Sequence, residues 1–509
     1  MSTIESSGLI ASAEQPSRSE APKGRYASTV NNLSKMGSSL ITVMVFGLAL
    51  RILMPRILGV DDIAAFYQVE SLGQLSFLLL TMGLSVYIKK TVKGEHQVAQ
   101  EIFLPIIVFQ AFLALVLFGV MIFGLNLIGY DSRIIHLVML FSGFQIFSNV
   151  QKHILNMFLV SLGEMGFVAR VDIIGKVTQV VIVCSVLLLT QDLFFVVAAF
   201  SLCHLVTVVL SLAKLRSLNL FKGSWGLGKL PKILQASVPF LLITVVSTIN
   251  GSTDVAMLSH LSTPFEVAQF GVAVKLKGAC LMLVPLIGSV IMPTLAKLNG
   301  KDMDAYTDYF LRTARYVLVF CIGLTLGLGF FSKDIVHFLF GEEFMVAGIV
   351  LIALSVSVTS TYLNVLVADS ISLTTNGKFF VFLSAGTAVF NAISNYFVIP
   401  LGMEWFGAGG AGLAVAFSTF SAEMINIVVL AIFVKHKSSS PSILLGLVLS
   451  IGLSLAFLMT YHSVGAISFP MKVLAFLVSY PCLVFICGLV KKPELHQGFA
   501  MAKAKLGRA

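Results

Sequence analysis

Four ionisable side chains lie inside long apolar stretches of the sequence, and they are the first candidates for chemistry. They are Arg51, Glu70, Asp254 and Lys275. A charged group is costly in hydrocarbon, so such residues usually face a water-filled cavity or pair with one another. At a rise of about 1.5 Å per residue, all four lie about 10 to 13 Å from the outer ends of their stretches. We therefore expect them to share one layer.

Two arrangements fit a layer of two acids and two bases. In the first, the four residues line the outer half of a central cavity and pair across two lobes when the cavity is closed to the outside. The bases then become available to an anionic ligand when these pairs break. In the second, two ion pairs within the lobes only neutralise buried charge. Lys277 and Glu423 lie deeper in their stretches, and we expect them to face the same cavity.

Other polar residues within apolar stretches favour structural roles. Asp172 and Lys176 are four residues apart, so on a helix we expect them to neutralise each other. Lys152 lies near the end of its stretch, where a long side chain can reach water. A lone His204 is more often a packing residue than a proton relay. Pro285 is expected to interrupt the helix that contains it, because proline cannot donate a backbone hydrogen bond.

The sequence offers no set of residues for covalent catalysis. No His or Cys cluster has the spacing of metal ligands, and no Ser, His and Asp set suggests a hydrolase. Residues 223–230 resemble a phosphate-binding loop, but Leu230 replaces the Ser or Thr that would bind Mg²⁺. Residues 407–412 have dinucleotide-site glycine spacing, yet they open an apolar stretch, where small residues permit close helix packing. We predict no catalytic residues, no metal, no cofactor and no enzyme.

The composition requires a membrane protein. Of 509 residues, 57% are hydrophobic and 11% are charged, whereas soluble proteins average about 45–50% and about 25%. This balance excludes a soluble globule and a disordered chain. Lipid cannot satisfy an open backbone, so each stretch of about 20 apolar residues must span as a helix. The sequence predicts an all-α integral membrane protein with about fourteen spans, at 38–58, 66–88, 103–128, 134–156, 168–189, 192–213, 234–260, 267–293, 312–331, 345–368, 379–400, 409–434, 442–462 and 471–490.

The charges in the loops set the orientation. Every second connection carries Lys or Arg, which marks the cytoplasmic side. Both termini are therefore expected in the cytoplasm of a multi-pass plasma membrane protein, and the dispersed basic residues argue against nucleic-acid binding. The expected organisation is a disordered cytoplasmic tail (1–36), an N-terminal lobe (37–216), a basic cytoplasmic linker (217–233), a C-terminal lobe (234–436), two further spans (437–490) and a basic tail (491–509).

A short internal repeat indicates that the two lobes are related. Asp62-Ile63-Ala64-Ala65-Phe66 and Glu266-Val267-Ala268-Gln269-Phe270 are 204 residues apart. Six predicted spans separate the copies, and an even number keeps the orientation. The repeat is therefore parallel, with spans one to six matching spans seven to twelve. Such repeats are typical of transporters built around a central path.

The sequence resembles a known family over nearly its whole length from about Leu40. The matching residues are Asp254-Val255-Ala256-Met257-Leu258, Glu266-Val267-Ala268, Phe270-Gly271, Ala273, Lys275-Leu276, Pro293, Leu58-Gly59 with Phe66, Leu162-Gly163, and the segment from Pro400 to Gly412. They resemble the Wzx-type flippases of O-antigen and exopolysaccharide synthesis, in the multidrug/oligosaccharidyl-lipid/polysaccharide exporter superfamily.

The resemblance implies two six-helix lobes in a V shape, with two additional C-terminal helices that resemble a pair forming a prenyl-tail groove in the lipid II branch. It also implies flipping of undecaprenyl-pyrophosphate-linked oligosaccharide to the outer leaflet by alternating access. A basic residue occupies the position of Lys275 in related lipid flippases. This chain departs from them because Glu70, Asp254 and Glu423 accompany its bases, which predicts a cavity of nearly balanced charge.

Two alternatives remain open at the level of sequence. A drug antiporter of the same superfamily, a MATE-like protein, would use Asp254 and Glu423 for H⁺ or Na⁺ coupling, although Arg51 and Lys275 argue against a cationic substrate. A membrane-embedded glycan polymerase or ligase would need a long external loop, and none of the predicted external loops is long enough. The expected partners are a lipid-linked oligosaccharide, membrane lipids and polysaccharide polymerase or assembly proteins.

Overall fold

The computed structural model of the chain describes residues 23–76, 80, 82–223, 227–374, 378–433, 469–486 and 488–489. Within these ranges the chain forms helices joined by turns and short loops, with no strand. Nine helices of the described part are long and apolar enough to cross a membrane. The predicted all-α membrane class is thus confirmed. The count of fourteen is not, because the predicted span 442–462 lies outside the described residues and Ser132–Gly143 is a shorter apolar helix.

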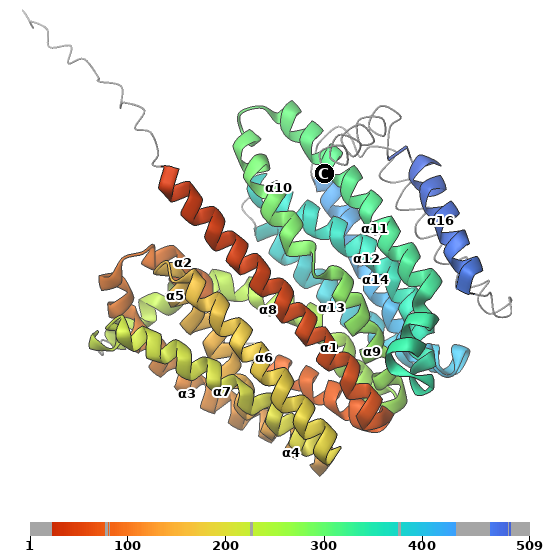
Figure 1. The fold of residues 1–509 in the computed structure, drawn as a ribbon, viewed down its shortest axis with the longest axis horizontal. Helices are drawn as coiled ribbons and strands as arrows, with labels where there is room; N and C mark the ends of the chain where they lie inside the picture. The colour runs from red at the N-terminus through yellow and green to blue at the C-terminus, as the bar shows by residue number, and fades with distance from the viewer. Residues whose placement is uncertain are drawn as a thin grey trace, which may run out of the picture.

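The helices form two bundles, with α1 between them (Figure 1). The first bundle contains α1 (Lys23–Ser76), α2 (Leu84–Val92), α3 (His96–Ile128), α4 (Ser132–Val150), the π-helical turn η1 (Gln151–Leu155), α5 (Asn156–Ser161), α6 (Met165–Thr190) and α7 (Leu193–Ser217). The second contains α8 (Leu230–Leu261), α9 (Pro264–Leu281), α10 (Val284–Leu298), α11 (Met303–Phe340), η4 (Glu342–Phe344), α12 (Met345–Thr374), α13 (Lys378–Phe406), α14 (Gly410–Phe433) and α16 (Phe469–Ile486). The short turns η2 (Leu220–Lys222) and η3 (Leu227–Lys229) connect the bundles.

Helix α1 contains the first predicted span and the first part of the second, 66–88, whose last residues belong to α2. A straight helix of its 54 residues would be about 80 Å long, far more than the roughly 30 Å of hydrocarbon. Gly59 interrupts it with a φ of 77°, a left-handed value that suits glycine. The two arms then lie side by side, as the contact between Arg51 and Glu70 shows. The predicted loop between these spans is therefore a tight turn.

Several predicted boundaries need correction. Helix α1 begins at Lys23, so residues 23–36, predicted as part of a disordered tail, are helical in the structure. The reason is that no proline occurs between residue 23 and Pro55, and the helix of the first span extends back through this segment. The predicted eighth span is divided into α9 and α10 at Met282 and Leu283. Pro285 stands in the first turn of α10, where its missing N–H costs nothing.

The buried apolar residues show where the bundles join. One core contains residues of both bundles, including Phe66 and Tyr67 of α1 and Phe270 of α9. It lies at the end of the first bundle that carries the Gly59 turn. A second core at the opposite end of that bundle includes Leu84 and Phe158 and, from the second bundle, only Ile233 at the start of α8. The bundles thus share a core at the Gly59 end, which the loop charges predict to be the outer side.

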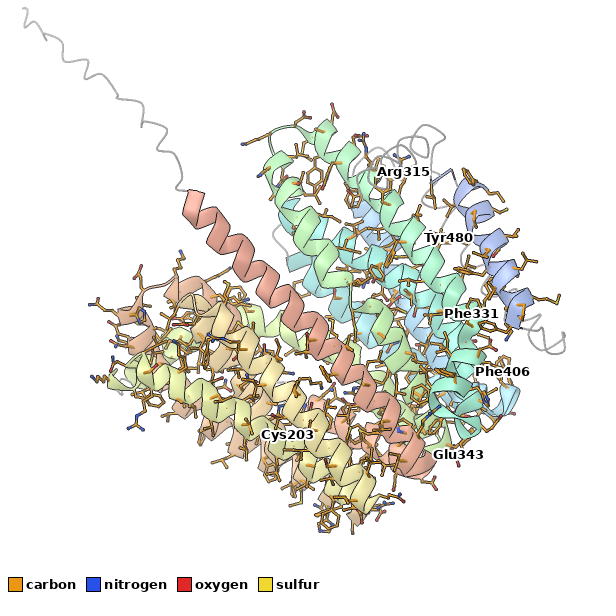
Figure 2. The ribbon with its side chains drawn as sticks, viewed as in Figure 1. Cys203, Arg315, Phe331, Glu343, Phe406 and Tyr480 are labelled. Carbon is orange, nitrogen blue, oxygen red and sulfur yellow. The ribbon has the colours of Figure 1, made fainter. Side chains whose placement is uncertain are left out.

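Helix α16 packs on the outside of the second bundle, along α11 (Figure 2). The Lys472 ammonium pairs with the Asp334 carboxylate at 2.5 Å. The Tyr480 hydroxyl donates to the backbone carbonyl of Val319 at 3.2 Å. Its ring packs closely against Gly323, where an added Cβ atom would lie 3.2 Å from the ring. The predicted fourteenth span is therefore held to α11 by one ion pair and a ring contact.

Candidate functional site

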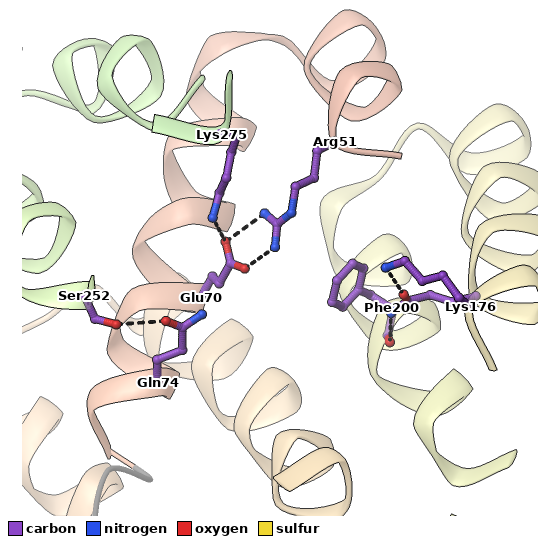
Figure 3. Close-up of polar contacts among 8 residues, drawn as sticks. Arg51, Glu70, Gln74, Lys176, Phe200, Ser252 and Lys275 are labelled. Carbon is purple, nitrogen blue, oxygen red and sulfur yellow. Dashed lines mark hydrogen bonds and ion pairs between the residues drawn. The ribbon is translucent and has the colours of Figure 1, made fainter. Parts of the chain in front are cut away.

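Three of the four predicted intramembrane charges meet where the bundles touch (Figure 3). Glu70, which is 6% exposed, accepts two hydrogen bonds from the Arg51 guanidinium, one of them at 3.0 Å between Nη1 and Oε2. Its Oε2 also lies 3.0 Å from the Lys275 Nζ. Arg51 and Glu70 come from the two arms of α1, whereas Lys275 comes from α9. The ion triad therefore contains one pair within the first bundle and one pair across the two bundles.

Neutral polar groups extend the contact beside the triad. The Ser71 hydroxyl donates to the Ser252 carbonyl at 2.7 Å. The Ser252 hydroxyl donates to the Gln74 Oε1 at 2.8 Å (Figure 3). Only a small hollow of about 40 Å³ remains between these residues and Lys275, about the room of one water molecule. The bundles are thus closed against each other at this level.

The close approach of the bundles requires glycine at position 271. A Cβ atom placed there would lie 2.1 Å from the Tyr67 ring, which is far inside van der Waals contact. The Lys275 Nζ also lies over the Tyr67 ring, 5.5 Å from the ring centroid. This distance allows a cation–π interaction. Gly271 therefore lets α9 bring Lys275 to Glu70.

Asp254, the fourth predicted residue, does not join the triad. Its carboxylate accepts hydrogen bonds from the Asn395 amide and the Thr419 hydroxyl, both at 2.8 Å. These partners lie on α13 and α14, so Asp254 is bound entirely within the second bundle. Asp254 therefore takes no part in the predicted pairing across the two lobes in this conformation, because two neutral donors hold its carboxylate.

Lys277 and Glu423 form a second polar cluster with Asp254. The Glu423 carboxylate accepts hydrogen bonds from Ser360 and Thr361, the latter at 2.7 Å. Lys277 is 9% exposed and interacts electrostatically with both carboxylates. The second bundle thus holds two acids around one base, each acid stabilised by two side-chain hydrogen-bond donors. We call these three residues the acidic cluster.

Two connected cavities lie within the first bundle. The Arg51 cavity has a volume of about 230 Å³, is lined mainly by polar side chains and includes Arg51, Glu70, Gln145 and Ser201. The Asp172 cavity has a volume of about 290 Å³ and includes Val43, Gln151, Asn156, Ala169 and Asp172. The two share Lys152, Lys176, Gln179 and His204 in their walls. The two cavities therefore adjoin each other, and we call them together the chamber, which ends beside the ion triad.

The two lysines of this chamber lack a carboxylate partner. Among the described residues, neither Lys152 nor Lys176 forms an ion pair within 4.0 Å, and Lys152 has no hydrogen bond. Lys176 donates to the Gln179 Oε1 at 2.8 Å, and Asp172 instead accepts from Asn156 at 3.3 Å. The expected neutralisation of Asp172 by Lys176 is therefore wrong. Both ammonium groups remain available to a negatively charged ligand.

The sequence prediction missed this chamber as a site. Its polar groups lie on six segments, α1, α4, η1, α5, α6 and α7, and each segment alone contributes only one to three of them. One signal was present in the spacing of Asp172, Lys176 and Gln179, which recur at intervals of four and three residues and so share one helix face. Such a polar stripe within an apolar span indicates a cavity more strongly than an ion pair.

The glycines at 407–412 have a packing role. The Glu266 carboxylate accepts hydrogen bonds from the backbone N–H groups of Gly409 at 2.5 Å and Gly412 at 3.3 Å. It therefore satisfies the first N–H groups of α14, where a negative charge is favourable. Gly410 lies directly against the backbone of Gly402. This supports the interpretation of the motif as close helix packing.

Solved structures define the class of fold. The lipid II flippase MurJ, in an inward closed conformation, is similar with a TM-score of 0.69 and 16% identity, over 89% of this chain and 98% of that protein. A multidrug resistance MATE family transporter of the MOP superfamily, in an inward-facing conformation, gives a TM-score of 0.63 and 14% identity, over 77% and 94%. The chain thus has the transporter fold that MurJ and MATE proteins share. At these identities the likeness establishes the fold alone.

Sequence similarity leads to two relatives. The chain is 22% identical over 432 residues to a protein of Haloferax volcanii named as the low-salt glycan biosynthesis flippase Agl15, covering 80% of this chain and 85% of the relative. It is 27% identical over 115 residues to a protein of Shigella dysenteriae named as an O-antigen transporter, covering 23% and 28%. No protein-family model matches the chain. These names agree with the predicted resemblance to polysaccharide flippases and with a transporter that performs no covalent step.

Proposed function

We propose that this protein moves a lipid-linked oligosaccharide with a diphosphate linkage, of the undecaprenyl-pyrophosphate type, across the plasma membrane. The direction is from the cytoplasmic to the outer leaflet, by alternating access between the two bundles. The named function of the relatives, a glycan biosynthesis flippase and an O-antigen transporter, supports this substrate class. A diphosphate and its sugars cannot cross about 30 Å of hydrocarbon unaided, whereas a polar chamber within the first bundle can hold them.

The charge of the chamber and the ion triad carries the proposal. Arg51, Lys152, Lys176 and Lys275 supply four formal positive charges, and Glu70 and Asp172 supply two negative ones, which leaves a net charge of +2. A diphosphate joined to a lipid and a sugar carries two negative charges and would balance this excess. The sequence predicted a nearly balanced cavity because it placed Asp254 and Glu423 in it, but these acids lie in the separate acidic cluster.

The ion triad provides a means to couple binding to movement. In the closed contact Glu70 is shared between Arg51 and Lys275. When the bundles separate at this level, Lys275 leaves with α9 and Glu70 keeps its bidentate partner Arg51. A bound diphosphate can then attract Lys275 in place of Glu70. The equilibrium between the two states therefore depends on which anion holds Lys275.

A coupling ion, either H⁺ or Na⁺, would bind at the acidic cluster. Thr419, Ser360 and Thr361 place hydroxyl oxygen atoms beside the carboxylates of Asp254 and Glu423. A carboxylate can take up H⁺, and oxygen ligands suit a hard cation such as Na⁺. The Oδ1 atom of Asn395 is buried without a hydrogen bond. A MATE-like antiporter would use such acids too, but the unpaired lysines of the first bundle favour an anionic substrate over a cationic drug.

The proposal includes a location and partners. We place the protein in the plasma membrane, the inner membrane of a bacterium, with both termini in the cytoplasm according to the loop charges. A polysaccharide polymerase or assembly protein would then consume the oligosaccharide on the outer side. This supplies a direction without hydrolysis of a nucleotide, because removal of the product draws the exchange outward.

Reconstitution tests the proposal. The full-length protein is placed in proteoliposomes that contain a fluorescent undecaprenyl-diphosphate-linked oligosaccharide, and the arrival of the label in the opposite leaflet is measured. The wild-type protein is expected to accelerate this movement, and Arg51→Ala and Lys275→Ala are expected to reduce it at least tenfold. Lys297→Ala, at the far end of α10, is the control. If the wild-type protein moved no lipid-linked glycan but exchanged an organic cation for H⁺ or Na⁺, the antiporter alternative would replace the flippase.

A further inference from the structure

The Asp172 cavity differs in chemistry from the Arg51 cavity that adjoins it. Its volume of about 290 Å³ is close to the lower end of the range of about 300 to 1,000 Å³ for small-molecule sites. All of its lining residues come from α1, η1, α5, α6 and α7. The cavity therefore belongs to the first bundle alone and keeps its walls when the bundles move relative to each other.

The Asp172 carboxylate in its wall makes this end of the chamber less suitable for a phosphate than the Arg51 end. Asp172 accepts one hydrogen bond, from the Asn156 amide at 3.3 Å, and Asn156 in turn accepts one from the Gln151 amide at 3.1 Å. An ionised carboxylate has about four acceptor positions, so it can bind further donors. It repels an anion but accepts hydrogen bonds from hydroxyl groups. A ligand part with several hydroxyls fits this end of the chamber, and the diphosphate fits the Arg51 end.

The π-helical turn brings these polar groups together. A π turn inserts one extra residue into a helix, and such turns are frequent at functional sites. Here η1 spans Gln151–Leu155, directly before Asn156. It lets Gln151, Lys152 and Asn156 all line the same cavity, although five residues of a regular helix would spread over more than one turn. The deviation from α-helical geometry therefore coincides with the polar wall.

Two buried polar atoms without hydrogen-bond partners lie in the Arg51 cavity, which adjoins the Asp172 cavity. The Ser201 Oγ has no hydrogen-bond partner in the described part of the chain, and Ser201 is 2% exposed. The Gln145 Oε1 is likewise buried without a partner. Both residues line the Arg51 cavity, which shares Lys152 and Lys176 with the Asp172 cavity. Buried polar atoms are normally hydrogen-bonded, so these atoms point to a polar ligand that supplies the bonds.

The remaining wall is apolar and small. Val43, Val168, Ala169 and Gly175 complete the cavity. A pyranose ring presents hydroxyl groups at its edge and C–H groups on its faces, so it needs hydrogen-bonding groups on one side and an apolar surface on another. The Asp172 cavity supplies both.

We propose that the Asp172 cavity binds the sugar directly attached to the diphosphate, that this sugar is uncharged, and that Asp172 accepts hydrogen bonds from its hydroxyl groups. This inference rests on the proposed function, because it assigns part of the same substrate. It makes Asp172 a specificity-determining residue. A site built to bind hydroxyl groups discriminates strongly against a ligand that lacks them, since its buried polar groups are then left unpaired.

Binding of four lipids to the purified full-length protein tests the inference. The probes are a prenyl diphosphate without sugar and the same lipid carrying one hexose, one N-acetylhexosamine or one hexuronate. The wild-type protein is expected to bind at least one neutral-sugar lipid about tenfold or more tightly than the bare lipid. Asp172→Asn is expected to weaken binding of that glycolipid about 10- to 100-fold, the range for a hydrogen bond to a charged group. It is not expected to weaken binding of the bare lipid, because it removes a negative charge from the chamber.

A second variant covers the possibility that Asp172→Asn does not fold. Val43→Phe fills the apolar side of the cavity, and it is expected to abolish the preference for the glycolipid while the bare lipid still binds. Asp308→Asn, an exposed acid on α11, is the matched control and is expected to change neither affinity. Retained binding of the bare lipid shows in each case that the first bundle is folded.

The outcomes separate this inference from the proposed function. If the wild-type protein bound the bare lipid as tightly as all three glycolipids, or if Asp172→Asn weakened all four lipids alike, the sugar site would be disproved and the flippase proposal would stand. A preference for the hexuronate over both neutral sugars would disprove the uncharged sugar. If none of the four lipids bound to the wild-type protein, the proposed function itself would fail, and the sugar site with it.

Discussion

The chamber of the first bundle and the acidic cluster of the second bundle both bury charged groups, but they differ in how these groups are satisfied. In the chamber, Lys152 has no partner among the described residues and Lys176 has only a neutral one, beside cavities of about 230 and 290 Å³. In the acidic cluster, Asp254 and Glu423 each accept two hydrogen bonds from neighbouring side chains. A negatively charged ligand can therefore form ion pairs with Lys152 and Lys176 in the chamber, because no described carboxylate lies within ion-pair distance of them.

This difference shows that the sign of a buried charge does not by itself mark a binding site. Sequence patterns find both regions equally well, because each interrupts apolar stretches with ionisable residues. The space beside the charged groups distinguishes the two regions, because cavities of about 230 and 290 Å³ adjoin Lys152 and Lys176. The sequence predicts that the two bundles are repeats of each other, yet they have different roles in the proposal. The first bundle binds the substrate anion, and the second holds acids for a coupling cation.

The largest effect is expected from removal of both unpaired bases. The double substitution Lys152→Gln and Lys176→Gln should weaken binding of prenyl diphosphate about 100-fold or more, because each base contributes a charge-assisted contact of about 1.5–3 kcal/mol. Binding of a labelled lipid to the purified protein measures this. Lys277→Gln in the acidic cluster is the matched variant, with an expected change below about threefold. Equal losses in both variants would contradict the division of roles between the bundles.

A smaller effect is expected on the stability of the acidic cluster. Asp254→Ala leaves the donors of Asn395 and Thr419 without their acceptor, which should lower the free energy of unfolding by about 1–3 kcal/mol. Asp254→Asn keeps an acceptor oxygen and should cost less than Asp254→Ala. Thermal unfolding in detergent compares the two. If both variants were as stable as the wild type, the hydrogen bonds described for Asp254 would not be the basis of its position.

The contact between the bundles can be changed with one methyl group. Gly271→Ala places a Cβ atom 2.1 Å from the Tyr67 ring, and overpacking of this kind costs about 1–3 kcal/mol. We expect a shift of about tenfold toward states in which the bundles are separated. Spin labels at the exposed positions Asp61, beside the Gly59 turn of α1, and Glu343 in η4 would report the distance. Gly278→Ala on the same helix, where no atom lies within 4 Å, should leave the distance distribution unchanged.

The smallest effect is expected at the surface. Arg133 pairs with Asp62 at 2.7 Å, but its side chain is 59% exposed. Exposed pairs contribute about 0–1 kcal/mol, so Arg133→Gln should change the unfolding midpoint very little. Lys275→Gln, which breaks a buried pair, should change it more. A larger effect at Arg133 than at Lys275 would show that the ion triad does not hold the bundles together.

The helices could be predicted from the sequence because the membrane leaves few alternatives. Apolar stretches of sufficient length had to be helical, and the first arm of α1, α3, α6 and α7 follow them closely. The interruptions were harder to place. Pro285 indicated the break between α9 and α10, but proline shifts the start of a helix rather than marking its exact end. The extension of α1 back to Lys23 was missed, since a polar segment gives no apolar signal.

From the sequence, the site could be predicted only where oppositely charged side chains pair with each other. Arg51, Glu70 and Lys275 were found because each interrupts an apolar stretch, and they do meet. Asp254 was assigned to the same group, but its partners Asn395 and Thr419 are neutral residues more than a hundred positions away, and nothing in their local sequence distinguishes them. A shared depth in the membrane fixes only the position of two residues along the membrane normal, and not whether they are neighbours. Which neighbour lies beside an acid is decided by helix packing.

The attachment of α16 has a consequence for the architecture. Its ion pair from Lys472 and the contacts of Tyr480 are both made to α11, far from the ion triad and the chamber. We expect a chain shortened before residue 437 to keep its two bundles and their mutual contact. The C-terminal part of the chain is then not required for the fold of the two bundles. Its sequence can change between related proteins without disturbing the contact between the bundles.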